Sequence, residues 1–446
     1  MAITLFQSSA QCLSLQEKIE QIIARKDQSK VEFSISVVDP QTGYCIYRHN
    51  SDTPLAPASN MKLVTSFASL KQFGADYKFV TKAGLSGNNL VIVGGGDPLL
   101  GFEGKDFIGQ IVEAVKAKSI TQLDGIIIDS SIFDNERVHL NWPRAQLNRD
   151  YASEICGINY NGNCIKVSAI QSAGEIQLTK EPDTEFLKLL NNVKLITKGD
   201  SAIGSNRTDQ ENTIIVYGKC RRPASFDVAI ENPAMFFGYL LSENLNRAGI
   251  TVQNPIMEKT VNPQDIQLIA EFNTPIMEVM LICNKKSLNI AAECMLKTLA
   301  NKTTGRAGSW QGGRDAIGKY LLSLGADRAE FYIDDGSGLS SVNKLSSNVI
   351  TKVLLDAYKS PLWPNFKQTL AIGGVDGTIR KQFYKDRYKN KVFAKSGFIN
   401  GVRALSGICT TSVSGKEYIF SIITNHANYP TKKAIYDIVE TVIDSE

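Results

Sequence analysis

The sequence predicts a mixed α/β protein in which a domain of antiparallel sheet flanked by helices is interrupted by a large inserted region. Three observations lead to this prediction. A β-hairpin and a helix lie near the N-terminus, helical periodicity and three strands return in the last third, and the residues between them form short β-like pieces broken by Gly, Asn and Asp. At 446 residues the chain is long for a single core, so two or three domains are expected.

The first part of the chain predicts a helix, a hairpin and a second helix. Apolar residues recur at helical spacing over residues 14–25. Alternating residues in 31–38, a Pro40-Gln41-Thr42-Gly43 turn and the run 44–47 predict the hairpin. Residues 59–72 again have the spacing of a helix with one buried face.

The inserted region is expected at residues 79–267, with a second domain nested in it at about 99–157. Residues 12–78 and 268–446 would then form one split domain. In the inserted region we expect helices at 107–116 and 234–247, and strands at 125–129 and 214–217. After it we expect helices at 275–283, 287–299, 312–324, 347–359 and 432–443, and strands at 391–395, 401–410 and 417–424.

The composition argues against nucleic acid binding, a membrane span and a metal site. The chain has 49 basic and 45 acidic residues without long runs of either, which gives no support to nucleic acid binding. No apolar run approaches the ~18 residues of a membrane span. Only three histidines are present and no Cys/His cluster has metal-ligand spacing, so no metal or cofactor is expected.

The N-terminus suggests export. A short apolar run, Ile3 to Phe6, precedes Ser8-Ser9-Ala10, which has the small residues that signal peptidase prefers. The run is too short and lacks a basic segment, so we interpret it as the truncated remnant of a signal cleaved after Ala10, which would place the protein in the periplasm. The alternative is an ordinary terminus.

Eight cysteines leave the redox environment open. Cys156 and Cys164 flank the turn dipeptide Asn161-Gly162, and a hairpin there would allow a local disulfide. Cys283, Cys294 and Cys409 lie in apolar surroundings and are expected to be buried thiols.

The first candidate site is Ser59-Asn60-Met61-Lys62, at the start of a predicted helix. A serine hydroxyl is a poor nucleophile near neutral pH, and a lysine one helical turn later lies close enough to take its proton. The unpaired N–H groups at a helix N-terminus would favour a developing oxyanion. The same spacing also occurs by chance, as in Ser341-Val342-Asn343-Lys344.

Two further motifs could complete this site. Lys395-Ser396-Gly397 ends a predicted strand, where the lysine and the hydroxyl can bind a carboxylate and the glycine lets a substrate approach the backbone. A Ser-x-Asn would relay a proton and hold the substrate amide. Ser287-Leu288-Asn289 and Ser341-Val342-Asn343 compete for this role, and the residues alone weight them nearly equally.

These motifs, in this order, resemble the S-x-x-K, S-x-N and K-T-G set of penicillin-binding proteins and serine β-lactamases. The chain looks most like the class C low-molecular-mass penicillin-binding proteins, the D-Ala-D-Ala carboxypeptidase/endopeptidase group, which carry inserted domains between the first two motifs. The similarity covers nearly the whole chain past residue 14. Its landmarks here are residues 57–62, 94–98, 129–130, 291–293, 335–340 and 401–407.

The resemblance assigns roles. It implies that Ser59 attacks the D-Ala-D-Ala carbonyl, that Lys62 accepts the proton with a pKa lowered by burial and by Lys395, and that Ser287, chosen because an Ala-Glu helix follows it, relays the proton. Asn289 would hold the substrate amide, and Lys395 and Ser396 the terminal carboxylate. Gly397 would admit the substrate backbone, and the N–H groups of Ser59 and Phe398 would form the oxyanion hole.

The implied function is a penicillin-sensitive serine D-alanyl-D-alanine carboxypeptidase/endopeptidase that acts on peptidoglycan peptides and is inhibited by β-lactams. A serine β-lactamase and an inactive wall-binding scaffold are the alternatives. Three departures bear on substrate preference: Ser396 replaces the usual Thr, Leu288 the frequent Asp, and Ser341 the frequent Arg. Asp150 and Glu154 are candidates for contact with the substrate side chain.

Overall fold

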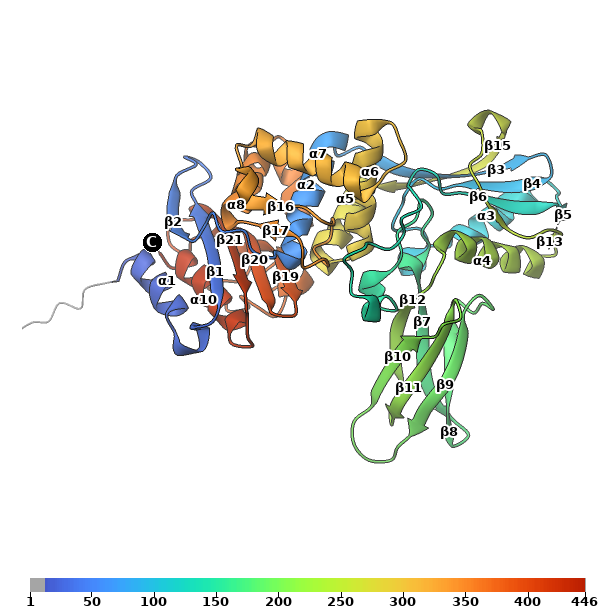
Figure 1. The fold of residues 1–446 in the computed structure, drawn as a ribbon, viewed down its shortest axis with the longest axis horizontal. Coiled ribbons are helices and arrows are strands. Elements are labelled where there is room, and N and C mark those ends of the chain that lie inside the picture. Colours follow the sequence, from blue (N-terminus) through green and yellow to red (C-terminus); the bar gives the residue numbers. More distant parts are fainter. Residues whose placement is uncertain (1–12, 446) are drawn as a thin grey trace, which may run out of the picture.

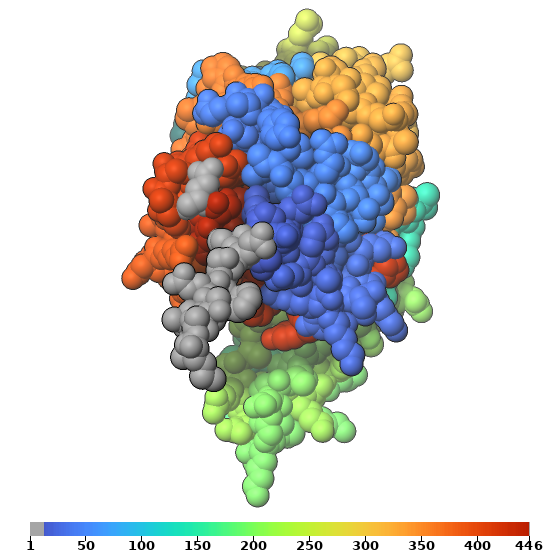
Figure 2. Space-filling model, turned by 90° about the vertical axis from the view of Figure 1, so that its left-hand side faces the viewer, coloured from blue at the N-terminus to red at the C-terminus, as the bar shows by residue number. Residues whose placement is uncertain are grey.

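The computed structural model describes residues 13–445. The molecule is elongated, with the first and last parts of the chain together at one end and the inserted region at the other (Figure 1). Viewed from the first end, the N-terminal part in blue and the C-terminal part in red lie side by side (Figure 2). The predicted signal remnant and its cleavage point after Ala10 lie outside the described residues.

A six-stranded antiparallel sheet forms the first end, in the order β18-β19-β20-β21-β1-β2. The N-terminal hairpin is added to the C-terminal strands through β1 and β21, where Ile35 lies opposite Ile422. This confirms the predicted antiparallel sheet and joins chain segments almost 400 residues apart in one sheet. The strands are β1 (Glu32–Val38), β2 (Cys45–His49), β18 (Ala371–Ile372), β19 (Val392–Ile399), β20 (Val402–Thr410) and β21 (Glu417–Asn425).

Helices cover both faces of this sheet (Figure 1). Successive residues of β20 point to opposite faces, so Leu405 and Cys409 pack with α1 and α10, while Ala404 and Ile408 join the core of α2 and α8. The helices are α1 (Leu15–Ile23), α2 (Met61–Phe73), α5 (Ile276–Leu281), α6 (Asn289–Thr304), α7 (Trp310–Ser323), α8 (Ser347–Lys359), α9 (Trp363–Thr369) and α10 (Thr431–Ile443).

The inserted region contains a mixed five-stranded sheet, in the order β14-β6-β4-β3-β15, whose apolar core includes α3 and α4. Its β15 continues directly into α5 and so returns the chain to the helices of the split domain. These elements are β3 (Lys78–Ser86), β4 (Asn89–Val93), α3 (Phe107–Lys116), β6 (Gly125–Asp129), α4 (Pro233–Arg247), β14 (Met257–Glu258) and β15 (Gln267–Pro275), beside the short pairs β5 (Gln122–Leu123) with β13 (Thr251–Val252), and β16 (Phe331–Tyr332) with β17 (Lys344–Leu345).

A separate β-rich piece spans residues 164–229, as two three-stranded sheets, and projects from the rest of the molecule (Figure 1). The nested unit expected at about 99–157 does not match this pairing. Buried β6 pairs with β4 and β14, so it belongs to the five-stranded sheet, and local sequence could not show partners so distant. The strands of the projecting piece are β7 (Cys164–Ser172), β8 (Glu175–Glu181), β9 (Lys188–Leu195), β10 (Ala202–Arg207), β11 (Thr213–Cys220) and β12 (Ala224–Ala229).

Two local expectations also need correction. The helix expected from Ser59 begins at Met61, and Ser59 lies in the 3₁₀ turn η2 (Ala58–Asn60) before it. The disulfide between Cys156 and Cys164 is absent, since both are buried free thiols. Residues 161–163 form a 3₁₀ turn that leads into β7 with no strand before it, so no hairpin brings the two sulfurs together.

The remaining cysteine expectation is confirmed for Cys283, Cys294 and Cys409, which are buried and free. Among the helices of residues 13–445, each is too short or too polar to cross a bilayer.

Candidate active site

The turn that carries Ser59 is held between β19 and the loop 335–340. Ala58 has a φ of 45°, a left-handed conformation that side chains other than glycine rarely adopt. Close packing keeps it there. A Cβ on Gly338 would lie 1.9 Å from the Ala58 carbonyl oxygen, and one on Gly397 would lie 2.8 Å from the carbonyl oxygen of Pro57. Both glycines therefore allow the backbone to approach the turn that carries Ser59.

Lys62 lies in the first turn of α2 and is fully buried. Its Nζ contacts the Ser59 Oγ at 3.1 Å, the Asn289 Oδ1 at 2.6 Å and the Ser337 carbonyl oxygen at 2.8 Å. The last two atoms can only accept hydrogen bonds. In a neutral lysine they would take its two N–H groups, and the lone pair would point at the hydroxyl of Ser59.

Lys395, on β19, is the second buried lysine of the site. Its Nζ donates to the Ser287 Oγ at 2.9 Å and to the carbonyl oxygen of Ser396 at 2.8 Å. Ser287 has a φ of 63° at the junction that leads into α6. Asn60 joins the Ser59 turn to β19, since its amide donates to the Lys395 carbonyl at 2.7 Å and accepts from the Ser406 Oγ at 2.6 Å.

Burial controls the charges of these two lysines. It lowers the pKa of Lys62, while Cys283, Glu293 and Asp335 act in the opposite direction. Burial, and then the charge of Lys62, lower the pKa of Lys395 to about 7. Two ammonium groups in one dry site repel each other, so the pair favours one neutral amine near neutral pH.

The end of β19 offers an open edge to a substrate. The short strand β18 pairs with Ala394 and Phe393, and within residues 13–445 no other strand pairs with this edge from Lys395 onward. On this part of β19 the Ser396 hydroxyl is hydrogen-bonded to the hydroxyl of Thr378 at 2.7 Å. Phe398 is 63% exposed. An extended peptide could pair with such an edge.

The structure separates the two Ser-x-Asn candidates. Ser287 and Asn289 contact the two buried lysines. Asn343 is instead buried inside the loop 334–343, where its Oδ1 accepts from the Asp334 N–H at 2.8 Å and its Nδ2 donates to Asp335 at 2.7 Å. Ser341 is exposed. This second motif thus has a structural role in its own loop.

The inserted region reaches the site through Tyr151. The Asn289 Nδ2 donates to the Tyr151 carbonyl at 2.7 Å. Asp150, next to it, is exposed, and partial desolvation of its carboxyl raises its pKa. Glu154 is less well placed for a substrate, because its Oε2 accepts from the backbone N–H of Asn232 at 3.0 Å within the inserted region.

Sequence reasoning missed two groups that contact Lys62 and Asn289, namely the carbonyls of Ser337 and Tyr151. Main-chain atoms carry no residue signature, so no pattern could reveal them. It also gave no role to Glu293, a fully buried carboxylate behind Ser337. The signal for Glu293 was present, because an acidic residue inside the apolar run of α6 needs a buried partner.

Comparison with known proteins gives a consistent match along the chain. The family model described as D-Ala-D-Ala carboxypeptidase 3 (S13) matches residues 15–443. The chain is 29% identical to a D-alanyl-D-alanine carboxypeptidase of Actinomadura sp. (strain R39), over 97% of this chain and 85% of that protein. It is 24% identical to the D-alanyl-D-alanine carboxypeptidase DacB of Haemophilus influenzae, over 86% and 85%.

Solved structures share the fold. The crystal structure of penicillin binding protein 4 (dacB) from Haemophilus influenzae has a TM-score of 0.82 at 21% identity, and the match covers 96% of this chain and 99% of that one. Bd3459, a predatory peptidoglycan endopeptidase from Bdellovibrio bacteriovorus, has a TM-score of 0.50 at 16% identity, with 93% of each chain covered.

Proposed function

The chain belongs to the D-Ala-D-Ala carboxypeptidase 3 (S13) family, and we propose that it hydrolyses D-Ala-D-Ala bonds of peptidoglycan peptides through an acyl-enzyme on Ser59. The observation that carries this proposal is the contact of Lys62 with Ser59 in a site that also contains Ser287, Asn289 and Lys395. A partly buried serine beside a fully buried lysine is the arrangement that an activated nucleophile requires.

In the acylation step Lys62, in its neutral form, takes the proton of Ser59 as the oxygen attacks the scissile carbonyl. Asn289 and Ser337 hold the two N–H groups of this amine, so its lone pair is directed at the serine. The backbone N–H groups of Ser59 and Phe398 stabilise the oxyanion. One such donor contributes ~3–4 kcal/mol in a comparable hydrolase.

The leaving D-alanine needs a proton on its amine. Ser287 supplies it from the Lys395 side of the site, because its hydroxyl accepts from Lys395 and can donate to the departing nitrogen. Water then attacks the acyl carbonyl and gives its proton to the Ser287–Lys395 pair, and Lys62 returns its proton to Ser59 as the ester bond breaks.

The substrate lies along the free edge of β19. Its terminal carboxylate binds Lys395 and the Ser396 hydroxyl. One N–H of the Asn289 amide already donates to Tyr151, so the other remains for the substrate amide carbonyl. A β-lactam, whose ring carbonyl and carboxylate imitate those of D-Ala-D-Ala, is expected to acylate Ser59 in the same pose.

Both carboxypeptidase and endopeptidase cleavage use these residues. Peptidoglycan lies outside the cytoplasm, so the protein acts after export, and the periplasm is the compartment we propose. A β-lactamase would release the penicilloyl group rapidly, whereas a carboxypeptidase of this mechanism retains it.

Mass spectrometry of the protein after incubation with penicillin tests the proposal directly. We expect one stable adduct, located by peptide mapping on Ser59, and release of D-alanine from a pentapeptide. Ser59→Ala should abolish both. The matched control is Ser341→Ala, which alters the second Ser-x-x-Lys sequence and should leave both unchanged. Rapid turnover of penicillin would favour a β-lactamase, and absence of both labelling and D-alanine release would favour a scaffold.

A further inference from the structure

We propose that Glu293 is a positioning residue that holds Lys62 in its proton-accepting geometry through the backbone of Gly336 and Ser337. This inference rests on the proposed function of Lys62 and adds a group that does not touch the substrate. It starts from the main-chain partner of Lys62, the Ser337 carbonyl oxygen, which accepts from its Nζ at 2.8 Å beside the side chains of Ser59 and Asn289.

Three N–H donors converge on the Glu293 carboxylate, which is completely buried on α6. Its Oε1 accepts from the Ser337 N–H at 2.7 Å, and its Oε2 from the Gly336 N–H at 2.9 Å and the Trp310 Nε1 at 2.8 Å. Holding the N–H groups of two successive residues fixes the peptide units on both sides of Gly336. Glu293 therefore fixes the chain up to the Cα of Ser337, and the next peptide unit, which contains the Ser337 carbonyl, is held by the Gly338 N–H that donates to Asp335 at 2.7 Å.

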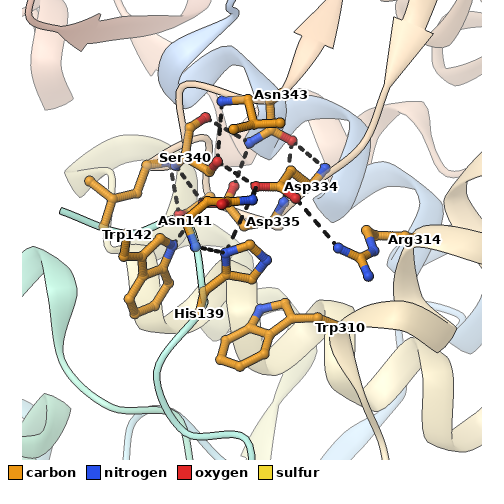
Figure 3. A network of polar contacts seen from close by, with 12 residues as sticks. His139, Asn141, Trp142, Trp310, Arg314, Asp334, Asp335, Ser340 and Asn343 are labelled. Atoms are coloured by element: carbon orange, nitrogen blue, oxygen red, sulfur yellow. Dashed lines mark hydrogen bonds and ion pairs between the residues drawn. The ribbon is translucent and has the colours of Figure 1, made fainter. Parts of the chain in front are cut away.

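The rest of the loop is fixed by two of its own aspartates, Asp334 and Asp335 (Figure 3). Asp335 accepts from the N–H groups of Gly338 and Ser340, each at 2.7 Å, and from the Trp142 Nε1 at 2.9 Å. Asn141, next to that tryptophan, donates to Asp334 at 3.0 Å. The inserted region thus helps to hold the loop, but only Glu293 holds the N–H of Ser337 itself.

A carboxylate is the group that this position requires. All three partners are N–H donors, so a protonated carboxyl would turn its own O–H toward a donor. The same is true of a glutamine, whose NH₂ group would face N–H groups. Burial and the neighbouring Asp335 raise the pKa of Glu293, whereas the three donors favour its charged form.

The charge of Glu293 also affects the pKa of Lys62, and this effect can be measured separately from the position of Lys62. The charged and titratable groups around Lys62 are Lys395 on β19, Cys283 before α6, Asp335 on the loop and Glu293. The negative charge of Glu293 raises the pKa of Lys62. Its removal should therefore lower the pH at which the acylation rate reaches half its maximum.

The test measures the second-order rate of acylation by a fluorescent penicillin as a function of pH, together with thermal unfolding. For Glu293→Gln we expect a loss on the order of 10- to 100-fold, the range seen when the hydrogen-bond partners of metal ligands are changed, and a midpoint at lower pH. Trp310→Phe, which removes one donor to Glu293, should slow acylation several-fold. The matched control is Trp363→Phe, because Trp363 packs against Tyr358 and Phe366 away from the loop.

Three results would overturn the inference. The first is a Glu293→Gln protein that acylates at the wild-type rate. The second is a slower Glu293→Gln protein with an unchanged pH midpoint and a lowered melting temperature, which would mark a purely structural role. If Glu293→Gln does not fold, the third is a folded Trp310→Phe protein that equals Trp363→Phe. If wild-type protein is not acylated at all, the proposed function fails instead.

Discussion

Gly397→Ala should slow acylation by displacing the nucleophile turn. An added Cβ would lie 2.8 Å from the Pro57 carbonyl oxygen and 3.2 Å from the Ala58 Cβ. Ordinary contacts begin near 3.4 Å, so β19 and the turn must separate by about half an ångström. A misplacement of about 1 Å costs on the order of 100-fold in rate, which gives a loss of roughly 10-fold here, or ~1.4 kcal/mol in the activation barrier.

Stopped-flow acylation by a fluorescent penicillin measures this loss, with a thermal melt to compare stability. The control is Gly318→Ala on α7, where an added Cβ meets its nearest atoms only at 3.9 Å. That helical substitution should leave acylation unchanged and stabilise the fold by up to ~1 kcal/mol. A Gly397→Ala protein that acylates within twofold of the wild type would refute the packing argument.

Three further outcomes are expected. Acylation should increase as the pH rises, with its midpoint near 7, because Lys62 and Lys395 must together lose one proton and the pKa of Lys395 is lowered to about 7; a rate that falls over this range would contradict the lysine base. Ser287→Ala should cut D-alanine release by about 100-fold or more at an unchanged melting temperature, and a small effect would remove Ser287 from the proton path. Asp134→Ala should lower the free energy of unfolding in denaturant by ~3 kcal/mol, because it leaves the buried Lys297 without its carboxylate at 2.6 Å; Lys297→Met, which removes the charge itself, should cost less.

Local patterns located most regular elements of the split domain. The helix expected at 347–359 has the observed bounds, and the strand expected at 401–410 begins one residue later in the structure. These segments have strong periodicity, because one face of each is buried against a neighbouring layer. The strands of 164–229 were largely missed. Several of their side chains are exposed on both faces, so they carry little alternation for a sequence to display.

The three motifs were visible for a similar reason, since each is a short run of side chains. The spacing of Ser59 and Lys62 already places a lysine one helical turn from a serine, and the structure keeps that contact. Which Ser-x-Asn belongs with them was not visible. Ser287 and Ser341 have the same local pattern, and only the return of α6 beside α2 brings the first of them to Lys395.

The sequence by itself therefore determined the chemistry that is available and most of the segments that carry it. The tertiary structure decided which of these groups meet. Glu293 is an acidic residue among apolar ones in the sequence, and it holds the N–H groups of Gly336 and Ser337 only because the loop 335–340 folds against α6. Contacts made through main-chain atoms and across distant segments depend on tertiary packing, which the local spacing of residues does not reveal.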